Sequence, residues 1–181
     1  MKGIIFTTFS DMVEEQYGLE TWDLLVEKVK PANRGAYTAG GTYPEVDLMG
    51  YVTELSKIEK ESPSALVEKF GEYLFPTLAK KYPIFLPKGI TFKEFMKSID
   101  KVIHIEVQKL HPEANLPTMT YEDPAPDKLV ILYKSPRKLC SLAIGLTRGA
   151  AAHFKVPINI CQPVCMLEGA NHCRLEIKIG R

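Results

Sequence analysis

The chain has 181 residues, of which 45% are hydrophobic and 25% charged, and its formal net charge is +1 at pH 7. That length suits one compact domain, or two subdomains that share a core. The balanced charge excludes recruitment of nucleic acid or of an anionic membrane through bulk electrostatics. No apolar run reaches the roughly 20 residues of a membrane span, and the start of the chain lacks a signal-peptide cleavage pattern. We therefore expect a cytoplasmic protein without a membrane partner.

The N-terminal third reads as helices, because apolar residues recur there at intervals of three and four. This spacing predicts helices over residues 1–17, 21–29 and 44–59, with Thr21 as the cap of the second. Ser62 and Pro63 supply an N-cap and a first-position proline for a helix that ends near Tyr82. Pro76 falls inside this helix, and we expect a kink there.

The C-terminal part changes character after one further helix. Thr91 and Glu94 match the capping-box pattern and open a helix to about His111. The remaining elements are expected as a loop over 112–127 with a short strand at 117–121, a strand at 128–133, a helix at 137–154, and strands at 156–167 and 173–179. The expected fold class is α+β: a helical N-terminal subdomain (1–62), and a C-terminal subdomain (63–181) with an antiparallel sheet and a packed helix.

Three hydrogen-bond donors follow one another at alternate positions where the strand at 128–133 ends. They are Tyr133, Ser135 and Arg137. In an extended segment such residues point to one face, so all three donors can meet one ligand. The planar guanidinium of arginine fits a carboxylate or a phosphate, and the two hydroxyls extend that surface. The pattern predicts a clamp for a small dianion.

His104 lies among apolar residues on the helix that begins at Thr91. The ordinary interpretation is a core histidine hydrogen-bonded to a carbonyl group. A neutral imidazole on an apolar wall is also a common haem ligand. A haem carries two negatively charged propionates, for which the donor triplet is suited.

The pattern Tyr133-x-Ser135-x-Arg137, with His104 upstream and Pro117 thirteen residues beyond that histidine, resembles the H-NOX family. These are haem–nitric oxide/oxygen-binding domains, similar to the haem domain of soluble guanylate cyclase, and the likeness covers the whole chain. The resemblance implies one haem b between the two subdomains, with His104 as the proximal iron ligand. It also implies that Tyr133, Ser135 and Arg137 hold the propionates, and that Pro117 presses on the macrocycle and distorts it.

The resemblance also assigns the distal side of the haem. Family members that hold O2 place a tyrosine where this chain has Leu142. The other positions that match the distal pocket are also without donors: Ile5, Phe9, Leu74, Leu78 and Leu146. Bound O2 gains from a donated hydrogen bond, whereas NO has little need of one. The pocket is therefore expected to bind NO and CO, and little or no O2.

The implied function is that of a stand-alone bacterial nitric oxide sensor. NO binding would weaken the bond between His104 and iron, and a rotation between the subdomains would carry the signal. The expected partner is a histidine kinase or a cyclic-di-GMP enzyme. We do not expect an enzyme, because no Ser-His-Asp, paired-carboxylate or phosphate-loop arrangement is evident.

Four cysteines occur, all in the C-terminal part. Cys161 and Cys165 are four apart on an expected strand and should share a face. A hairpin centred on Gly169 places Cys165 opposite Cys173, and Cys140 lies near the start of the preceding helix. Four thiolates would form a structural zinc site, and some H-NOX proteins that resemble this chain carry one. The alternative is that all four are reduced thiols.

A second function remains open at this level. The segment Cys165-x3-Gly169-x3-Cys173 also resembles the end of 4-vinyl-reductase-type ligand domains. The chain would then be a haem-free zinc/thiol redox or small-molecule-binding signalling module. A haem spectrum separates the two functions.

Overall fold

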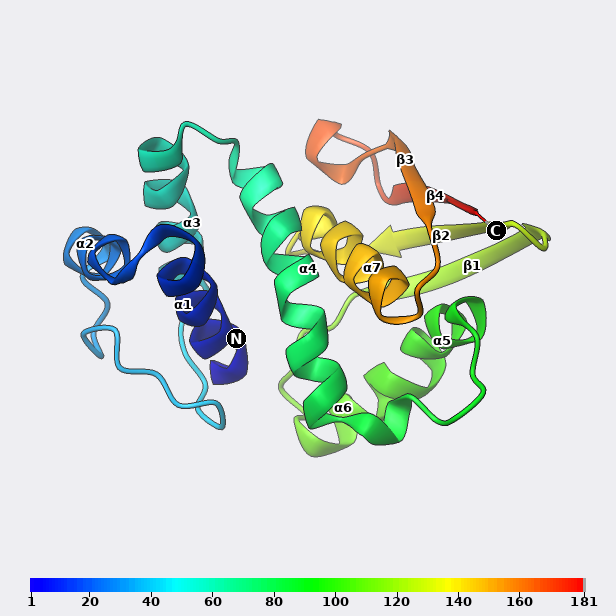
Figure 1. Ribbon diagram of the computed structural model, residues 1–181, viewed down its shortest axis with the longest axis horizontal. Helices are drawn as coiled ribbons and strands as arrows, with labels where there is room; N and C mark the ends of the chain where they lie inside the picture. Colours follow the sequence, from blue (N-terminus) through cyan, green and yellow to red (C-terminus); the bar gives the residue numbers. More distant parts are fainter. Residues whose placement is uncertain (181) are drawn as a thin grey trace.

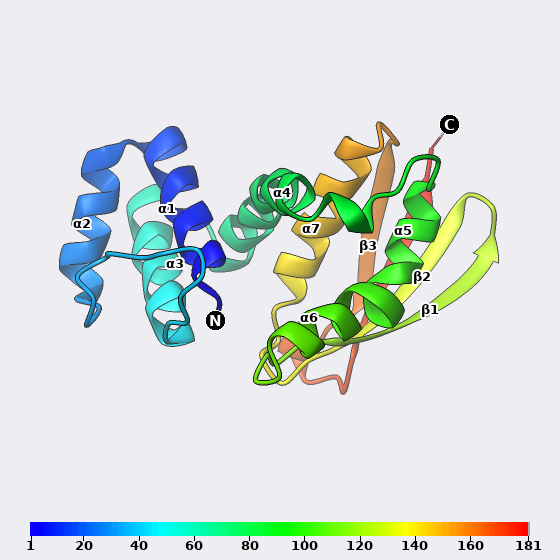
Figure 2. The same ribbon diagram turned by 90° about the horizontal axis from the view of Figure 1, so that it is seen from below.

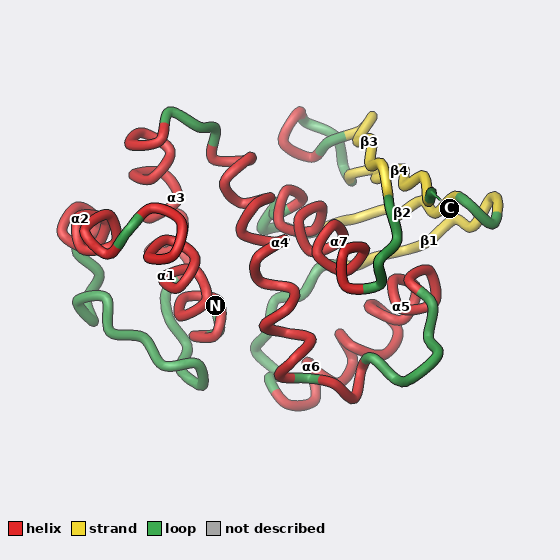
Figure 3. The backbone as a smooth tube through the Cα atoms, viewed as in Figure 1, coloured by secondary structure: helices red, strands yellow, loops and turns green. Residues whose placement is uncertain are grey.

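The computed structural model describes residues 1–180 as a helical bundle joined to a helix-covered sheet (Figures 1 and 3). The first half contains α1 (Gly3–Tyr17), α2 (Leu19–Val29), α3 (Glu45–Glu59) and α4 (Pro63–Lys81). The second half contains η1 (Pro83–Phe85), α5 (Phe92–Ser98), the π-helical turn η2 (Ile99–Ile103), α6 (His104–Leu110), β1 (Thr118–Ala125), β2 (Lys128–Lys134), α7 (Cys140–His153), β3 (Ile158–Val164), η3 (Met166–Glu168) and β4 (Cys173–Ile179). Within residues 1–180, no helix combines the length and the apolar character needed to cross a bilayer.

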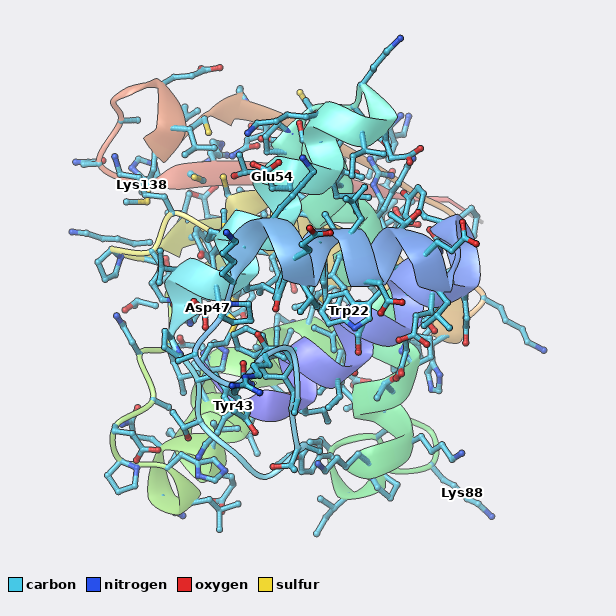
Figure 4. All side chains as sticks on the ribbon, turned by 90° about the vertical axis from the view of Figure 1, so that its left-hand side faces the viewer. Trp22, Tyr43, Asp47, Glu54, Lys88 and Lys138 are labelled. Atoms are coloured by element: carbon cyan, nitrogen blue, oxygen red, sulfur yellow. The ribbon has the colours of Figure 1, made fainter. Side chains whose placement is uncertain are left out.

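The N-terminal core is rich in aromatic side chains. Figure 4 looks onto the bundle from outside and shows Trp22 and Tyr43 among its helices. Inside the bundle, Phe9 meets Phe70 edge to face at 5.2 Å between ring centroids. The buried residues of this core come from α1, α2, α3 and the first half of α4: Phe6, Phe9, Met12, Val13, Trp22, Leu25, Leu48, Tyr51, Val52, Leu55, Leu66, Val67, Phe70 and Leu74. The helix α4 therefore contributes to the N-terminal core although it begins the C-terminal part.

The C-terminal core lies between α7, α5 and one face of an antiparallel sheet with the strand order β1-β2-β4-β3. Alternate residues of the two central strands point into it, since Leu129 pairs with Ile177 and Tyr133 pairs with Cys173. These four side chains are at most 2% exposed. The sequence of β2 is apolar at every position from Leu129 to Tyr133, and Val130 on its other face is also buried.

The two halves join where α4 crosses α7 (Figure 2). Glycines allow the backbones to touch: a Cβ on Gly145 would lie 2.0 Å from the carbonyl oxygen of Glu68. A Cβ on Gly71 would lie 2.7 Å from the carbonyl oxygen of Leu142, and one on Gly149 would lie 2.6 Å from Cβ of Phe75. The Gly-x3-Gly spacing of α7 is thus a helix-packing feature.

The expected α+β class is confirmed, and several local features are confirmed with it. Ser62 caps α4 by accepting from Ala65 N at 3.2 Å. Thr91 and Glu94 form the expected capping box. The cap assigned to Thr21 was wrong: α2 begins at Leu19, and the Thr21 hydroxyl donates to the carbonyl of Tyr17.

Two regions differ from expectation because tertiary contacts override local pattern. The expected continuous helix after Thr91 contains the π-helical turn η2 directly before His104. The expected loop over 112–127 contains a longer strand than the one expected at 117–121, because β1 runs from Thr118 to Ala125 and passes through Pro124. A proline is tolerated there because β1 lies at the sheet edge and its register shifts between Glu122 and Ala125.

Substitution of Gly145 by alanine tests the α4–α7 crossing. The added methyl group meets the backbone of α4, so we expect the free energy of unfolding to fall by about 1–3 kcal/mol, although alanine favours helix. Gly40→Ala is the control, because nothing lies within 4 Å of its Cβ position. Urea denaturation of both variants measures the difference. A Gly145→Ala protein as stable as the parent would contradict this packing.

Candidate functional site

His104 opens α6, immediately after the π-helical turn η2. Its side chain is 17% exposed, and Nδ1 lies 3.6 Å from Oδ1 of Asp100. That distance exceeds a hydrogen bond, and Nδ1 is fully buried without a partner. Burial lowers the pKa of His104, while the carboxylate of Asp100 and the backbone of Pro117 oppose the shift. The imidazole is therefore held neutral, which is the form that binds a metal.

The three expected clamp residues lie together at the end of β2. Tyr133 and Ser135 are buried, and the Ser135 Oγ accepts from the backbone N of Arg137 at 3.2 Å. Burial raises the pKa of Tyr133, while the Ser135 side chain and the backbone of Leu139 oppose the shift, so the phenol stays a proton donor.

Arg137 connects parts of the chain that are far apart in sequence. Its Nε lies 2.6 Å from Oε2 of Glu45, an ion pair without hydrogen-bond alignment, and its Nη1 donates to the carbonyl of Asn115 at 3.2 Å. Glu45 begins α3 in the helical bundle, and Asn115 lies two residues before Pro117. No pattern in the sequence indicates either partner, because neither belongs to the element that carries Arg137.

The expected distal residues gather in the N-terminal core. All six belong to the same cluster: Ile5, Phe9, Leu74, Leu78, Leu142 and Leu146. Phe9 and Leu74 are at most 1% exposed, and Leu146 also touches the C-terminal core. The contact of Gly71 with the backbones of Leu142 and Leu146 brings the leucines of α4 and α7 together.

Tyrosines of the N-terminal core use their hydroxyls elsewhere. The hydroxyls of Tyr37 and Tyr51 lie 2.9 Å apart and bond one another. The hydroxyl of Tyr73 faces Glu15, and burial together with this carboxylate raises the pKa of Tyr73 to about 12. These phenols are therefore engaged away from the six apolar residues.

Three of the four cysteines form a buried cluster. The sulfurs of Cys140, Cys165 and Cys173 all lie within 4.8 Å of one another, with 3.8 Å between those of Cys140 and Cys165. The backbone N of Met166 donates to the sulfur of Cys173 at 3.2 Å. Burial and the neighbouring thiols raise the pKa of Cys173 to about 12. The expected approach of Cys165 and Cys173 across the turn is confirmed.

The expectation for Cys161 is wrong. Cys161 is exposed and pairs with Glu176, whose side chain also faces solvent. The register shifts between Cys161 and Val164, so β3 has one extra residue there relative to β4. A shift of one residue reverses the face to which all later residues of the strand point. Cys165 therefore points inward while Cys161 points outward.

These residues fit a haem in chemical type. A neutral histidine offers iron its second ring nitrogen, because the buried Nδ1 faces Asp100. Tyr133, Ser135 and Arg137 would hold the propionates as donors. The segment 115–117 joins the two groups, since Asn115 bonds Arg137 and the backbone of Pro117 reaches His104.

Comparison with known proteins gives consistent matches. Residues 2–162 match the sequence model of the family described as haem-NO-binding. An H-NOX protein from Shewanella oneidensis, solved in the Fe(II)NO ligation state, is 36% identical, with a TM-score of 0.92 and all of both chains covered. The Fe(II) unliganded H-NOX protein from K. algicida is 31% identical, with a TM-score of 0.91 over 100% of this chain and 97% of the other.

A curated relative matches at lower identity. Soluble guanylate cyclase 89Db from Drosophila melanogaster is 25% identical over 140 residues, which is 76% of this chain. Those residues are 20% of that protein, so the chain spans about a fifth of its length.

Proposed function

Because the chain belongs to the haem-NO-binding (H-NOX) family, whose domains bind haem and sense gases, we propose that it is a nitric oxide sensor with little affinity for O2. The observation that supports this proposal best is the donor-free distal cluster around Leu142 and Leu146. Bound haem supplies the ferrous iron that takes up a diatomic ligand. A hydrogen bond from the protein contributes on the order of 1.5–3 kcal/mol when its acceptor is charged. O2 would lack that contribution in this pocket, and NO and CO need it least.

The protein's own residues divide the work between two sides. His104 would supply the protein's ligand to the haem iron, through a bond that NO would weaken or release. Tyr133, Ser135 and Arg137 would hold the propionates, and Pro117 would press on the macrocycle. The apolar distal residues exclude water and leave the bound gas without a donor.

The proposed signal is a change in the orientation of the two halves of the molecule relative to each other. Arg137 is part of the clamp, where its backbone bonds Ser135, and its side chain pairs with Glu45 of the helical bundle. A change at the clamp therefore alters a contact between the two halves. We propose a rigid rotation of the N-terminal subdomain once His104 is released. A histidine kinase or a cyclic-di-GMP enzyme reads this change as the partner protein.

The cysteine cluster supports a second proposal, a zinc ion held by Cys140, Cys165 and Cys173. Three sulfurs within 4.8 Å of one another can converge on one tetrahedral metal ion, with a fourth position open to another ligand. Zinc also lowers the pKa of a coordinating thiol, which offsets the effect of burial on Cys173. The haem-free alternative function has this cluster as its sole support.

Replacement of His104 by glycine tests the iron ligand. We expect the reduced His104→Gly protein to lose its haem absorption unless imidazole is supplied, because the cavity left by the ring admits the free ligand. His172→Gly is the control, since that ring contacts Asn171 in the turn before β4. Absorption spectra of the reduced protein measure the haem content. They are recorded anaerobically before and after NO is added, and then after O2 is added. Unchanged haem content in His104→Gly would move the ligand to another residue.

A phenol at position 142 tests the basis of gas selection. Leu142→Tyr adds a donor beside the expected ligand site, so O2 affinity should rise by roughly 10- to 150-fold, the equivalent of 1.5–3 kcal/mol. Leu142→Phe is the matched control, because it adds the ring without the hydroxyl. Equilibrium titration of the reduced proteins with O2 measures both. A stable O2 complex in the parent protein, or equal O2 affinity in the two variants, would refute the proposed selection.

Metal analysis tests the zinc proposal. After purification without chelator, we expect one zinc per chain in the parent protein and in Cys161→Ser, whose thiol lies outside the cluster. Cys173→Ser should lose the metal, because it removes one of the three clustered sulfurs. Less than one zinc per chain in the parent, or equal zinc in both variants, would count against the site.

A further inference from the structure

The helical segment that leads to His104, formed by α5 and η2, is held against strand β1 by a row of polar contacts. Lys97 Nζ bonds Asp123 Oδ2 at 2.7 Å, and Lys93 pairs with the same carboxylate. Lys93 Nζ also donates to the carbonyl of Ala125 at 2.6 Å. One turn further on, Asp100 Oδ1 accepts from the backbone N of Met119 at 2.8 Å.

These contacts have matched spacing on the two elements. On the helical side they fall at residues 93, 97 and 100, which share one face, and His104 continues that face. On the strand they fall at residues 125, 123 and 119, in the opposite direction along the chain. Because β1 is an edge strand, the helical segment also covers main-chain groups that β2 does not pair.

Asp100 is the contact of this row that reaches the iron ligand. Its Oδ1 is bound to Met119 N and lies 3.6 Å from Nδ1 of His104. That Nδ1 is buried and has no hydrogen-bond partner in the structure. A small movement of the ring would turn this contact into a hydrogen bond. The carboxylate of Asp100 is less free to move than the ring, because its hydrogen bond from Met119 N holds it against β1.

A histidine that binds a metal usually donates its other ring N–H to a carboxylate or a carbonyl. This second bond selects the tautomer, orients the ring and makes the ligating nitrogen more basic. Asp100 and the backbone of Pro117 are the two groups that raise the pKa of His104 against the effect of burial, and only Asp100 carries charge. A charged acceptor gives the stronger bond.

We propose that Asp100 is the positioning residue of His104 and sets the strength of its bond to iron. The carboxylate, anchored by Met119 N, receives the Nδ1 proton and leaves Nε2 as the ligating atom. A stronger histidine–iron bond raises the threshold at which NO releases His104. This inference rests on the proposed function, and it adds a residue outside the haem-contacting set that decides how readily the sensor responds.

The test compares Asp100→Asn with Asp123→Asn. Both remove one carboxylate from the same row, but Asp123 contacts lysines alone. Resonance Raman spectra of the reduced, unliganded proteins report the iron–histidine stretching frequency. We expect this frequency to fall in Asp100→Asn and to stay unchanged in Asp123→Asn. The fraction of NO complex that has released histidine should rise in Asp100→Asn alone, and its haem dissociation constant should increase roughly tenfold or more.

A second measurement does not depend on the loaded protein. In the haem-free protein, 15N NMR of His104 should show the Nδ1–H tautomer, and Asp100→Ala should shift the population towards the Nε2–H form. Thermal unfolding shows whether a variant has lost its fold. Asp100→Asn and Asp123→Asn each remove one carboxylate from the same row, so their unfolding temperatures can be compared directly. An unchanged stretching frequency and an unchanged tautomer in the Asp100 variants would overturn the inference. Haem retained in His104→Gly would instead overturn the proposed function.

Discussion

The structure depends on the close crossing of α4 and α7. Gly71 and Gly145 let the two backbones approach, and any side chain at either position would meet main-chain atoms. This contact joins the helical bundle to the half that contains the sheet. It also places Leu74 of α4 and Leu142 of α7 in one apolar cluster. The crossing of the two helices thus also brings together the apolar residues on which the proposed gas selection depends.

The site is polar on one side and apolar on the other, and each side suits its task. On the side of His104, a carboxylate bound to a strand edge lies 3.6 Å from the buried Nδ1. The six residues expected on the other side are aliphatic or aromatic and carry no hydrogen-bond donor. Arg137 belongs to both halves through Glu45 and Asn115, so a disturbance at the clamp is not confined to one subdomain.

The buried cysteine cluster shows how a shift of one residue in strand register decides which side chains come together. Cys140 at the start of α7 meets Cys165 and Cys173 because a register shift in β3 turns Cys165 inward. The same shift leaves Cys161 on the solvent face. Of the three buried sulfurs, that of Cys140 lies three residues beyond Arg137, at the start of α7, whereas Cys165 and Cys173 come from the turn before η3 and the start of β4.

By itself the sequence determined the features that depend on neighbouring residues: the helical periods, the Thr91 capping box, the α+β order of elements, and the donor triplet at Tyr133. Residue type made His104 a candidate metal ligand, but its role beside a haem and the distal position of Leu142 came only from the resemblance to the H-NOX family. Tertiary structure decided the π-helical turn before His104, the passage of β1 through Pro124, and the exclusion of Cys161. It also supplied the contacts of Asp100 and Glu45. Bulges and long-range contacts depend on how separate elements pack, and local propensity alone does not predict that packing.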